Sequence, residues 1–153
     1  MKKACFPGSF DPFTKGHEDV VQKALGLFDE IVIGVGYNTS KTPYYLLESR
    51  IEHIKFLFQH EPRVVVKTFT GLTITFAQSE GCTHLLRGLR DVKDFNYETP
   101  IAVLNRQMSG LETVFILPEP SLFAINSSII REIQKSGGNI DAFVTNASKL
   151  VLA

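Results

Sequence analysis

The chain has 153 residues, 44% of them hydrophobic, which suffices for the core of one domain spanning residues 1–153. Its 16 basic and 16 acidic residues give a formal net charge of zero, which argues against a broad surface for nucleic acid or membrane. No apolar run approaches the ~18 residues of a membrane-spanning helix. Pro7, Gly8 and Asp11 interrupt the place where a signal peptide would be apolar. The expected location is therefore the cytoplasm, where Cys5 and Cys82, which lack metal-ligand spacing, are expected to stay reduced.

Short apolar runs alternate along the chain with segments whose apolar residues recur at helical spacing. In the first such segment, residues 16–28, the apolar face consists of Val20, Val21, Ala24, Leu25 and Phe28. In chain order the sequence predicts a strand at 4–6 that ends at Pro7, a helix at 16–28, a strand at 31–35, a helix at 47–58, a strand at 64–66, a helix at 72–79, a strand at 84–86, a helix at 95–108, a strand at 114–117, and helices at 128–135 and 142–152.

Strands that are apolar throughout, rather than at alternate positions, are typical of parallel sheets buried on both faces. The alternation therefore predicts an α/β fold, a single Rossmann-like, doubly wound domain with a five-stranded parallel sheet and helices on both faces. In such sheets ligands bind beyond the carboxyl ends of the strands, where the strand order reverses. We therefore expect the loops after residues 6, 35, 86 and 117 to line one crevice.

The first of these loops contains the sequence T-K-G-H at residues 14–17. Gly16 lets backbone and ligand approach closely, and His17 falls in the first turn of the next helix, where free N–H groups favour an anion. His17 can therefore donate to a phosphate, or it can cap its own helix. Its charge stays open, because the helix dipole favours neutral imidazole and a phosphate favours imidazolium. A P-loop, a G-x-G-x-x-G fingerprint and a G-x-S-x-G elbow are all absent from the sequence.

Two further loops carry polar groups suited to phosphate. Arg87 and Arg90 follow the fourth predicted strand, and the guanidinium is a rigid donor fork that matches phosphate. After the fifth strand, Ser127 and Ser128 precede an apolar-periodic helix, so these serines are expected to supply its N-cap.

These three motifs resemble those of the nucleotidyltransferase superfamily, and together they are similar to those of the phosphopantetheine adenylyltransferases. Residues 14–17 match T/H-x-G-H, and residues 87–98 match R-G-[LI]-R-x-x-x-D-[FY]-x-[YE]-E. Residues 125–131 match I-S-S-[TS]-x-[IVL]-R, except that Asn126 replaces the first serine, which leaves the contact of that serine in doubt. The resemblance runs from residue 3 to residue 133, nearly the full chain.

The resemblance implies transfer of AMP from ATP to 4′-phosphopantetheine, which gives dephospho-coenzyme A and pyrophosphate in coenzyme A biosynthesis. It implies catalytic roles for His17, Lys41 and Arg90. The residues that it implies for the acceptor are Ser9, Lys41, Thr73 and Arg87. Those that it implies for ATP are Ser9, Phe10, His17, Gly88, Leu89, Arg90, Glu98, Leu122, Phe123, Ala124, Ile125, Asn126, Ser127 and Ser128.

The acceptor oxygen is already anionic in the reaction of this family, so neither a general base nor a covalent nucleophile is needed, and catalysis is positioning plus stabilisation of charge. Mg²⁺ would be bound mainly through the ATP phosphates and water. The resemblance also implies a homohexamer, while the net charge of zero argues against nucleic acid or membrane as a partner.

Two other functions stay open at this point. Nicotinate-nucleotide adenylyltransferases and glycerol-phosphate cytidylyltransferases share T-x-G-H, but the signature at residues 87–98 and the short chain argue against both. A nucleotide-binding regulatory module without catalysis is the other alternative. The presence of His17, Lys41, Arg87 and Arg90 argues against it.

Overall fold

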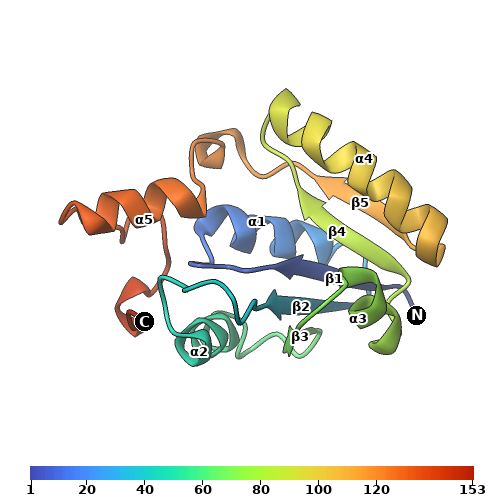
Figure 1. The fold of residues 1–153 in the computed structure, drawn as a ribbon, viewed down its shortest axis with the longest axis horizontal. Helices are drawn as coiled ribbons and strands as arrows, with labels where there is room; N and C mark the ends of the chain where they lie inside the picture. The colour runs from blue at the N-terminus through green and yellow to red at the C-terminus, as the bar shows by residue number, and fades with distance from the viewer.

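A computed structural model, which describes residues 1–153, contains one parallel sheet of five strands in the order β3-β2-β1-β4-β5 (Figure 1). The strands are β1 (Lys3–Gly8), β2 (Glu30–Gly36), β3 (Val64–Phe69), β4 (His84–Gly88) and β5 (Glu112–Ile116). The helices are α1 (Lys15–Ala24), α2 (Leu47–Leu57), α3 (Thr73–Ser79), α4 (Val92–Ser109) and α5 (Ser127–Lys135), with short 3₁₀ turns η1 (Pro120–Leu122) and η2 (Ala147–Lys149). The predicted α/β fold with a five-stranded parallel sheet is confirmed.

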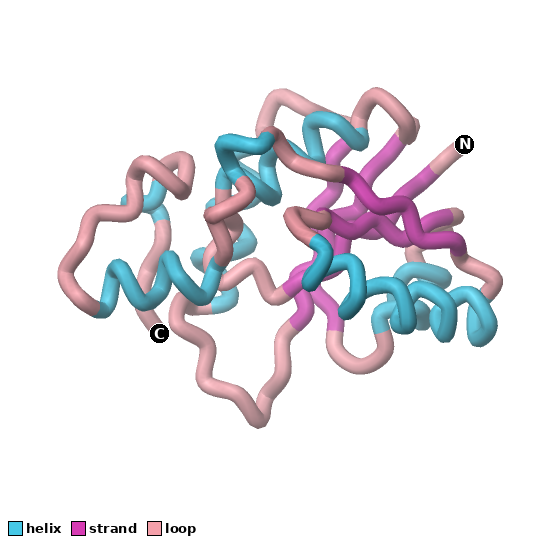
Figure 2. The backbone as a smooth tube through the Cα atoms, turned by 90° about the horizontal axis from the view of Figure 1, so that it is seen from above, coloured by secondary structure: helices cyan, strands magenta, loops and turns pink.

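Successive residues of the strands point to opposite faces of the sheet, and each face is covered by helices. On one face Ala4 and Phe6 of β1 join a core cluster with residues of α1 and α2. On the other face Cys5 packs with Ile74 and Ala77 of α3. Figure 2 shows the helices on both sides of the strands. None of these helices is both long and apolar enough to cross a membrane.

The strand order reverses between β1 and β4, because the chain first adds β2 and β3 on one side of β1 and then β4 and β5 on the other. β1 and β2 end on the side of the molecule where α5 and the C-terminus lie, whereas the N-terminus lies at the opposite end (Figure 1). The reversal therefore opens a crevice at the carboxyl ends of the strands, as such sheets require.

β1 continues through Pro7 and Gly8, so the prediction that it ends before Pro7 is wrong. A proline lacks the N–H that a central strand needs. Here the pairing of β1 with β4 ends at Cys5, while its pairing with β2 continues to Gly8. The carbonyl oxygen of Pro7 is free to accept a hydrogen bond from Arg87 instead.

The helix predicted at residues 142–152 does not form, and turns take its place apart from the 3₁₀ turn η2. Asn146 has φ 54°, in the left-handed region, which ends helical geometry there. The carbonyl oxygens of this segment also have other partners: Phe143 accepts from the N–H of Lys15, and Thr145 contacts His53 Nε2 at 2.6 Å. Tertiary contacts therefore override the apolar periodicity of this segment.

Candidate active site

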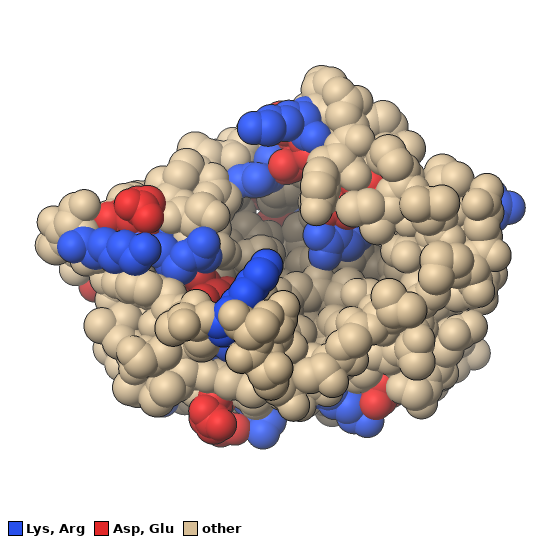
Figure 3. All heavy atoms as spheres, in the orientation of Figure 1, with Lys and Arg blue, Asp and Glu red and all other residues tan.

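The carboxyl ends of β1, β2 and β4 open onto two adjoining cavities of about 1110 Å³ and 290 Å³. Pro7, Gly8, Ser9 and Arg87 line both of them, so the two cavities meet at the end of β1. The face drawn in Figure 3 is hollowed near its centre, and Lys and Arg side chains surround the hollow. We call the two spaces the larger and the smaller cavity.

The loop between β1 and α1 makes a sharp turn at the wall of the smaller cavity. Phe10 adopts φ 47°, a left-handed conformation that is rare outside glycine. Phe10 is buried, and its ring packs edge-on against Phe6, Phe13 and His17, with ring centroids 5.1–5.2 Å apart. A Cβ on Gly8 would lie 2.8 Å from that ring. Glycine is therefore required at position 8 for this turn to close.

His17 caps its own helix and also lines the smaller cavity. Its Nδ1 accepts a hydrogen bond from the backbone N–H of Thr14 at 2.9 Å, and the Thr14 hydroxyl lies 3.1 Å away. Burial, together with the nearby cations Arg87 and Arg90, lowers the pKa of His17 to about 3. The imidazole is therefore neutral, and because Nδ1 accepts, Nε2 carries the proton and is a hydrogen-bond donor.

Arg87 and Arg90 each lie against a carboxylate. Arg87 donates through Nε and Nη2 to Glu98 and through Nη1 to the Pro7 carbonyl, which is 2.6 Å away. Arg90 donates through Nε and Nη2 to Asp94 and through Nη1 to the Ile125 carbonyl at 3.3 Å. These bonds use three of the five N–H groups of each guanidinium, so two remain for a ligand.

The Arg90–Asp94 pair is fully ionised at neutral pH. Burial raises the pKa of Asp94, but the hydrogen bonds from the Arg90 side chain and backbone outweigh it and hold that pKa below its usual range. The carboxylates thus fix the direction of both guanidinium groups before any phosphate arrives.

Helix α5 begins at the smaller cavity, and its N-cap is Asn126. The Asn126 side chain accepts from the N–H of Ile129 at 2.9 Å, so the expectation that Ser127 or Ser128 caps the helix is wrong. Asn fills this role because it is as good an N-cap as serine. The Ser127 hydroxyl instead donates to the Pro12 carbonyl at 2.8 Å. The N–H groups of Ser127 and Ser128, the first two of α5, are left for an anion in the cavity.

The larger cavity is cationic. Its lining includes the side chains of Lys41, Arg50, Arg87, Arg131 and Lys135, and a single carboxylate, that of Asp11. Asp11 is already engaged, because its two oxygens accept the backbone N–H groups of Tyr44 at 2.8 Å and Tyr45 at 2.9 Å. This cavity is therefore suited to an anionic group.

A third cavity of about 380 Å³ lies between α3 and α4 and shares Pro7, Thr73 and Arg87 with the larger one. Eight of its 14 lining residues are hydrophobic, among them Ile101 and Leu104 of α4. This third space adjoins the cationic larger cavity, and we call it the apolar cavity. Arg87 thus stands where all three cavities meet.

The structure brings most of the expected site residues together. All four residues expected at the acceptor line the larger cavity: Ser9, Lys41, Thr73 and Arg87. Nine of those expected at ATP line the smaller cavity: Ser9, Phe10, His17, Gly88, Arg90, Glu98, Ile125, Asn126 and Ser127. Five lie outside its lining: Leu89, Leu122, Phe123, Ala124 and Ser128. Leu89 is buried, and its N–H donates to the carbonyl of Ile116.

Other residues of the crevice were not expected from the sequence. Asp94 and Pro118 line the smaller cavity, and Arg50, Arg131 and Lys135 line the larger one. Asp94 belongs to the second motif and Arg131 is the last residue of the third, so the motifs themselves held these two signals. Arg50 lies three residues after Leu47 and four before Ile54, on the apolar face of α2. A charged residue on an apolar helical face is the one signal that pointed to it.

The residues of the crevice do not form a metal-binding set. The chain has no group of three or more His, Cys, Asp or Glu side chains placed to hold a metal ion. The nearby carboxylates of Glu98 and Asp94 are paired with arginines, and Asp11 accepts two backbone N–H groups. The donor set therefore does not fit a resident metal ion.

Among solved structures, the chain is similar to a bifunctional NMN adenylyltransferase/ADP ribose pyrophosphatase from Francisella tularensis, complexed with AMP and a Mn ion. The TM-score is 0.67 at 16% identity, over 98% of this chain and 46% of that one. A structure from Vibrio parahaemolyticus, described as a nicotinate-nucleotide adenylyltransferase, gives 0.64 at 16% identity over 97% of each chain. These similarities show a shared fold.

Similarity of sequence is more specific. A family model described as cytidylyltransferase-like matches residues 5–133. The phosphopantetheine adenylyltransferase of Bacteroides fragilis is 42% identical over 150 residues, which cover 98% of this chain and 100% of that protein. That of Cytophaga hutchinsonii is 46% identical over 144 residues, covering 94% and 96%. The chain therefore belongs to the cytidylyltransferase-like family and, within it, to the phosphopantetheine adenylyltransferases.

Proposed function

We propose that this chain transfers the adenylyl group of ATP to 4′-phosphopantetheine, giving dephospho-coenzyme A and pyrophosphate in coenzyme A biosynthesis. One observation carries the proposal beyond family membership. Arg87 lies where three spaces meet: the smaller cavity, which His17 also lines, the cationic larger cavity and the apolar cavity. A reaction that joins a nucleotide to a phosphorylated acceptor needs a space for the nucleotide phosphates, a space for the acceptor phosphate and a space for the long arm of the acceptor, whose methyl and methylene groups alternate with amides.

The smaller cavity is the proposed place of the ATP phosphates that react. Helices α1 and α5 both begin at its wall, and helix N-termini attract anions. His17 and Arg90 line this space, and both keep side-chain donors without a partner in the chain: Nε2 of His17 and two N–H groups of Arg90. We assign these groups to the α-phosphate and its neighbours.

The larger cavity and the apolar cavity are the proposed place of the acceptor. Lys41 and Arg87 would bind its phosphate, and the pantetheine arm would lie along the groove of Thr73, Ile101 and Leu104. Ser9 lines both the larger and the smaller cavity, so the two phosphates would meet beside it.

In the proposed reaction an oxygen of the acceptor phosphate supplies the electron pair for a new bond to the α-phosphorus of ATP. The bond from that phosphorus to the bridging oxygen of the β-phosphate breaks, and pyrophosphate leaves. Because the acceptor phosphate is largely a dianion at neutral pH, no proton has to be removed from it. The residues of the site therefore contribute positioning and donors for developing charge.

Mg²⁺ would arrive on the ATP phosphates as part of the substrate, since the chain offers no ligand set of its own. We also propose that the protein acts in the cytoplasm, as a homohexamer. Helix α4 supports assembly, because its one buried residue is Glu98 while many large apolar side chains are exposed. Those of them that line none of the three cavities are Val92, Phe95 and Val103, whereas Tyr97, Ile101, Leu104 and Met108 line the apolar cavity.

Pyrophosphate release with a panel of acceptors tests the proposal. The protein is mixed with Mg²⁺, ATP or CTP, and 4′-phosphopantetheine, nicotinate mononucleotide or glycerol 3-phosphate. We expect 4′-phosphopantetheine with ATP to give by far the highest kcat/KM. Equal or better turnover with nicotinate mononucleotide, or with CTP and glycerol 3-phosphate, would overturn the assignment. Nucleotide binding without turnover of any acceptor would indicate a regulatory module instead.

A further inference from the structure

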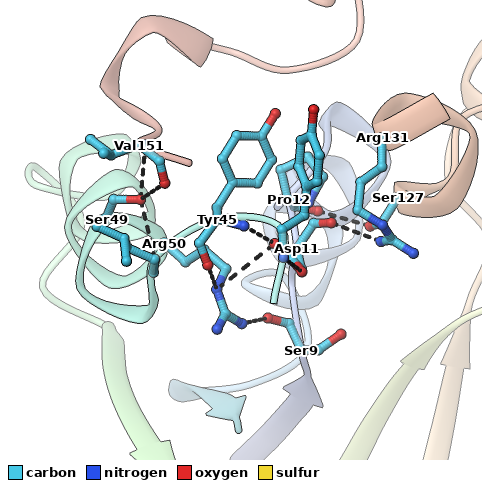
Figure 4. A network of polar contacts seen from close by, with 11 residues as sticks. Ser9, Asp11, Pro12, Tyr45, Ser49, Arg50, Ser127, Arg131 and Val151 are labelled. Atoms are coloured by element: carbon cyan, nitrogen blue, oxygen red, sulfur yellow. Dashed lines mark hydrogen bonds and ion pairs between the residues drawn. The ribbon is translucent and has the colours of Figure 1, made fainter. Parts of the chain in front are cut away.

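Arg50 is a charged residue of the crevice to which the proposed reaction gives no role. It lies in α2, its side chain is 3% exposed, and it lines the larger cavity. Its nearest carboxylate, Asp11, is 4.0 Å away from Nε, too far for a strong hydrogen bond. The guanidinium instead donates to two backbone carbonyl oxygens, through Nη1 to Ser9 and through Nε to Tyr45 at 3.2 Å (Figure 4). The buried guanidinium of Arg50 therefore fixes the positions of two backbone carbonyl groups.

The Ser9 carbonyl belongs to the peptide that joins Ser9 to Phe10. That peptide is trans, and in a trans peptide the C=O and N–H point in opposite directions. By holding the Ser9 oxygen toward α2, Arg50 directs the Phe10 N–H away from α2. This N–H has no acceptor within the chain, whereas Ser9 and Phe10 both line the smaller cavity. An N–H left without a partner at a cavity wall is available to a ligand.

The conformation of Phe10 explains why the peptide between Ser9 and Phe10 has to be fixed by a hydrogen bond. Phe10 has φ 47°, a conformation that persists in a non-glycine residue only where neighbouring contacts fix it. Aromatic packing acts on the Phe10 ring, whereas the hydrogen bond from Arg50 acts on the peptide plane that precedes it. Arg50 is itself fixed, because its second acceptor, Tyr45, is tied to Asp11 through the Tyr45 N–H at 2.9 Å.

We propose that Arg50 is a positioning residue for adenylyl transfer, which aims the Phe10 N–H at a phosphate oxygen of ATP in the smaller cavity. The inference rests on the proposed function, since it takes ATP to be the ligand of that cavity. Lysine cannot replace Arg50, because a single ammonium does not reproduce the planar fork that reaches both carbonyl oxygens.

NMR tests the aim of this N–H directly. The dipeptide Ser-Phe occurs once in the sequence, at positions 9 and 10. Labelling serine with ¹³C at the carbonyl and phenylalanine with ¹⁵N therefore selects the Phe10 amide alone. When ATP and Mg²⁺ are added without acceptor, this amide proton should move downfield in the wild type and by less than half as much in Arg50→Lys. No downfield shift in the wild type, or the same shift in both proteins, overturns the proposal.

Kinetics separate positioning from a loss of stability. Arg50→Met should lower kcat by about tenfold to a hundredfold. Arg50→Lys should have a kcat between those of Arg50→Met and the wild type. The ATP dissociation constant, measured by calorimetry, should change less than kcat in both. Arg63→Met is the matched control, because Arg63 also donates to a backbone carbonyl, that of Leu25, but lines none of the three cavities. It should lower the melting temperature and leave kcat unchanged.

A wild-type kcat in folded Arg50→Lys would overturn the positioning role. Failure of the proposed function has a different signature: the wild type would bind ATP and shift the Phe10 amide, yet fail to turn over 4′-phosphopantetheine. If Arg50→Met does not fold, Arg50→Lys and the Phe10 amide still decide the question.

Discussion

Thr14 and His17 form a hydrogen bond that sets the chemistry of the smaller cavity. The Thr14 N–H donates to Nδ1 of His17 at 2.9 Å, so the proton of the neutral ring lies on Nε2. The sequence offered two readings for His17, a helix cap and a phosphate donor. The structure shows the cap at Nδ1 and leaves Nε2 for the second role, so one side chain has a separate atom for each.

The pH dependence of stability should reveal the neutral form of His17. Its pKa is about 3 in the folded chain, against 6.5 for the exposed side chain. Between these values the unfolded chain binds a proton that the folded chain does not, so stability falls as the pH drops from about 7 towards 3. At pH 4 this effect reaches about 3 kcal/mol.

Urea unfolding of the wild type and His17→Asn, between pH 4 and 7, measures this difference. The variant keeps an oxygen acceptor near Nδ1 but does not titrate, so it should lose less stability on acidification. His53, whose pKa burial also lowers, is present in both proteins and cancels. Equal losses in both proteins would show that His17 titrates normally in the folded chain.

Replacing His17 should affect the transition state more than bound ATP. We expect His17→Ala to lose at least ~10² in kcat, as is usual for one positioned donor, while the ATP dissociation constant changes by less than about tenfold. The measurements are steady-state kinetics and calorimetry. His60→Ala, at an exposed histidine outside all three cavities, is the control and should keep full activity.

His17→Asn separates the two roles of His17 in the same assay. It can accept from the Thr14 N–H but has no donor at the position of Nε2. Its kcat should therefore be as low as that of His17→Ala. Recovery of kcat in His17→Asn would mean that the cap is what matters, and parallel loss of ATP binding would mean that His17 binds the ground state.

Lys41 should act on the acceptor. A charge-assisted contact is worth about 1.5–3 kcal/mol, so Lys41→Ala should lower kcat/KM for 4′-phosphopantetheine by roughly ten- to a hundredfold. The ATP dissociation constant should stay the same, because Lys41 lines only the larger cavity. Lys55→Ala, at an exposed lysine paired with Glu52, is the control. An unchanged kcat/KM would place Lys41 in solvent during catalysis.

Lys41 is a cleaner test of acceptor binding than Arg87. Arg87 donates twice to Glu98, which is 8% exposed, so its removal leaves a buried carboxylate without a partner. Breaking such a pair usually destabilises a protein by several kcal/mol. An effect of Arg87→Ala on kcat would therefore mix lost phosphate binding with local unfolding.

Assembly is tested by sedimentation equilibrium at micromolar concentration. Val92, Phe95 and Val103 of α4, which line none of the three cavities, are 73%, 48% and 50% exposed in the single chain. Burial of such a face between copies would stabilise an oligomer. We expect a species of six times the 17.1 kDa chain mass. A monomer under these conditions would contradict the hexamer.

The sheet could be predicted from the sequence because its strands are buried on both faces. Runs such as residues 31–35 are apolar throughout, and no other common architecture gives five of them alternating with helices. The three motifs could also be placed at one crevice, since the carboxyl ends of parallel strands share an edge. Local pattern and topology agreed in both cases.

The missed features depend on contacts between segments far apart in the chain. The segment at 142–152 has helical spacing, but Thr145 binds His53 and Asn146 adopts a left-handed turn. The role of Arg50 depends on its hydrogen bond to Ser9, which lies 41 residues away. The N-cap of α5 depends on which of the three adjacent polar residues 126–128 accepts the N–H of Ile129. Periodicity and propensity carry no information on such pairings.

The central claim, adenylyl transfer to 4′-phosphopantetheine, is tested most directly by ³¹P NMR of the complete reaction. The mixture contains the protein, ATP, Mg²⁺ and 4′-phosphopantetheine labelled with ¹⁸O in its phosphate. We predict that the acceptor monoester signal is replaced by a pyrophosphate diester, together with free pyrophosphate, and that ¹⁸O occupies the bridge of the diester. Formation of AMP and pyrophosphate with the acceptor monoester unchanged would contradict the account.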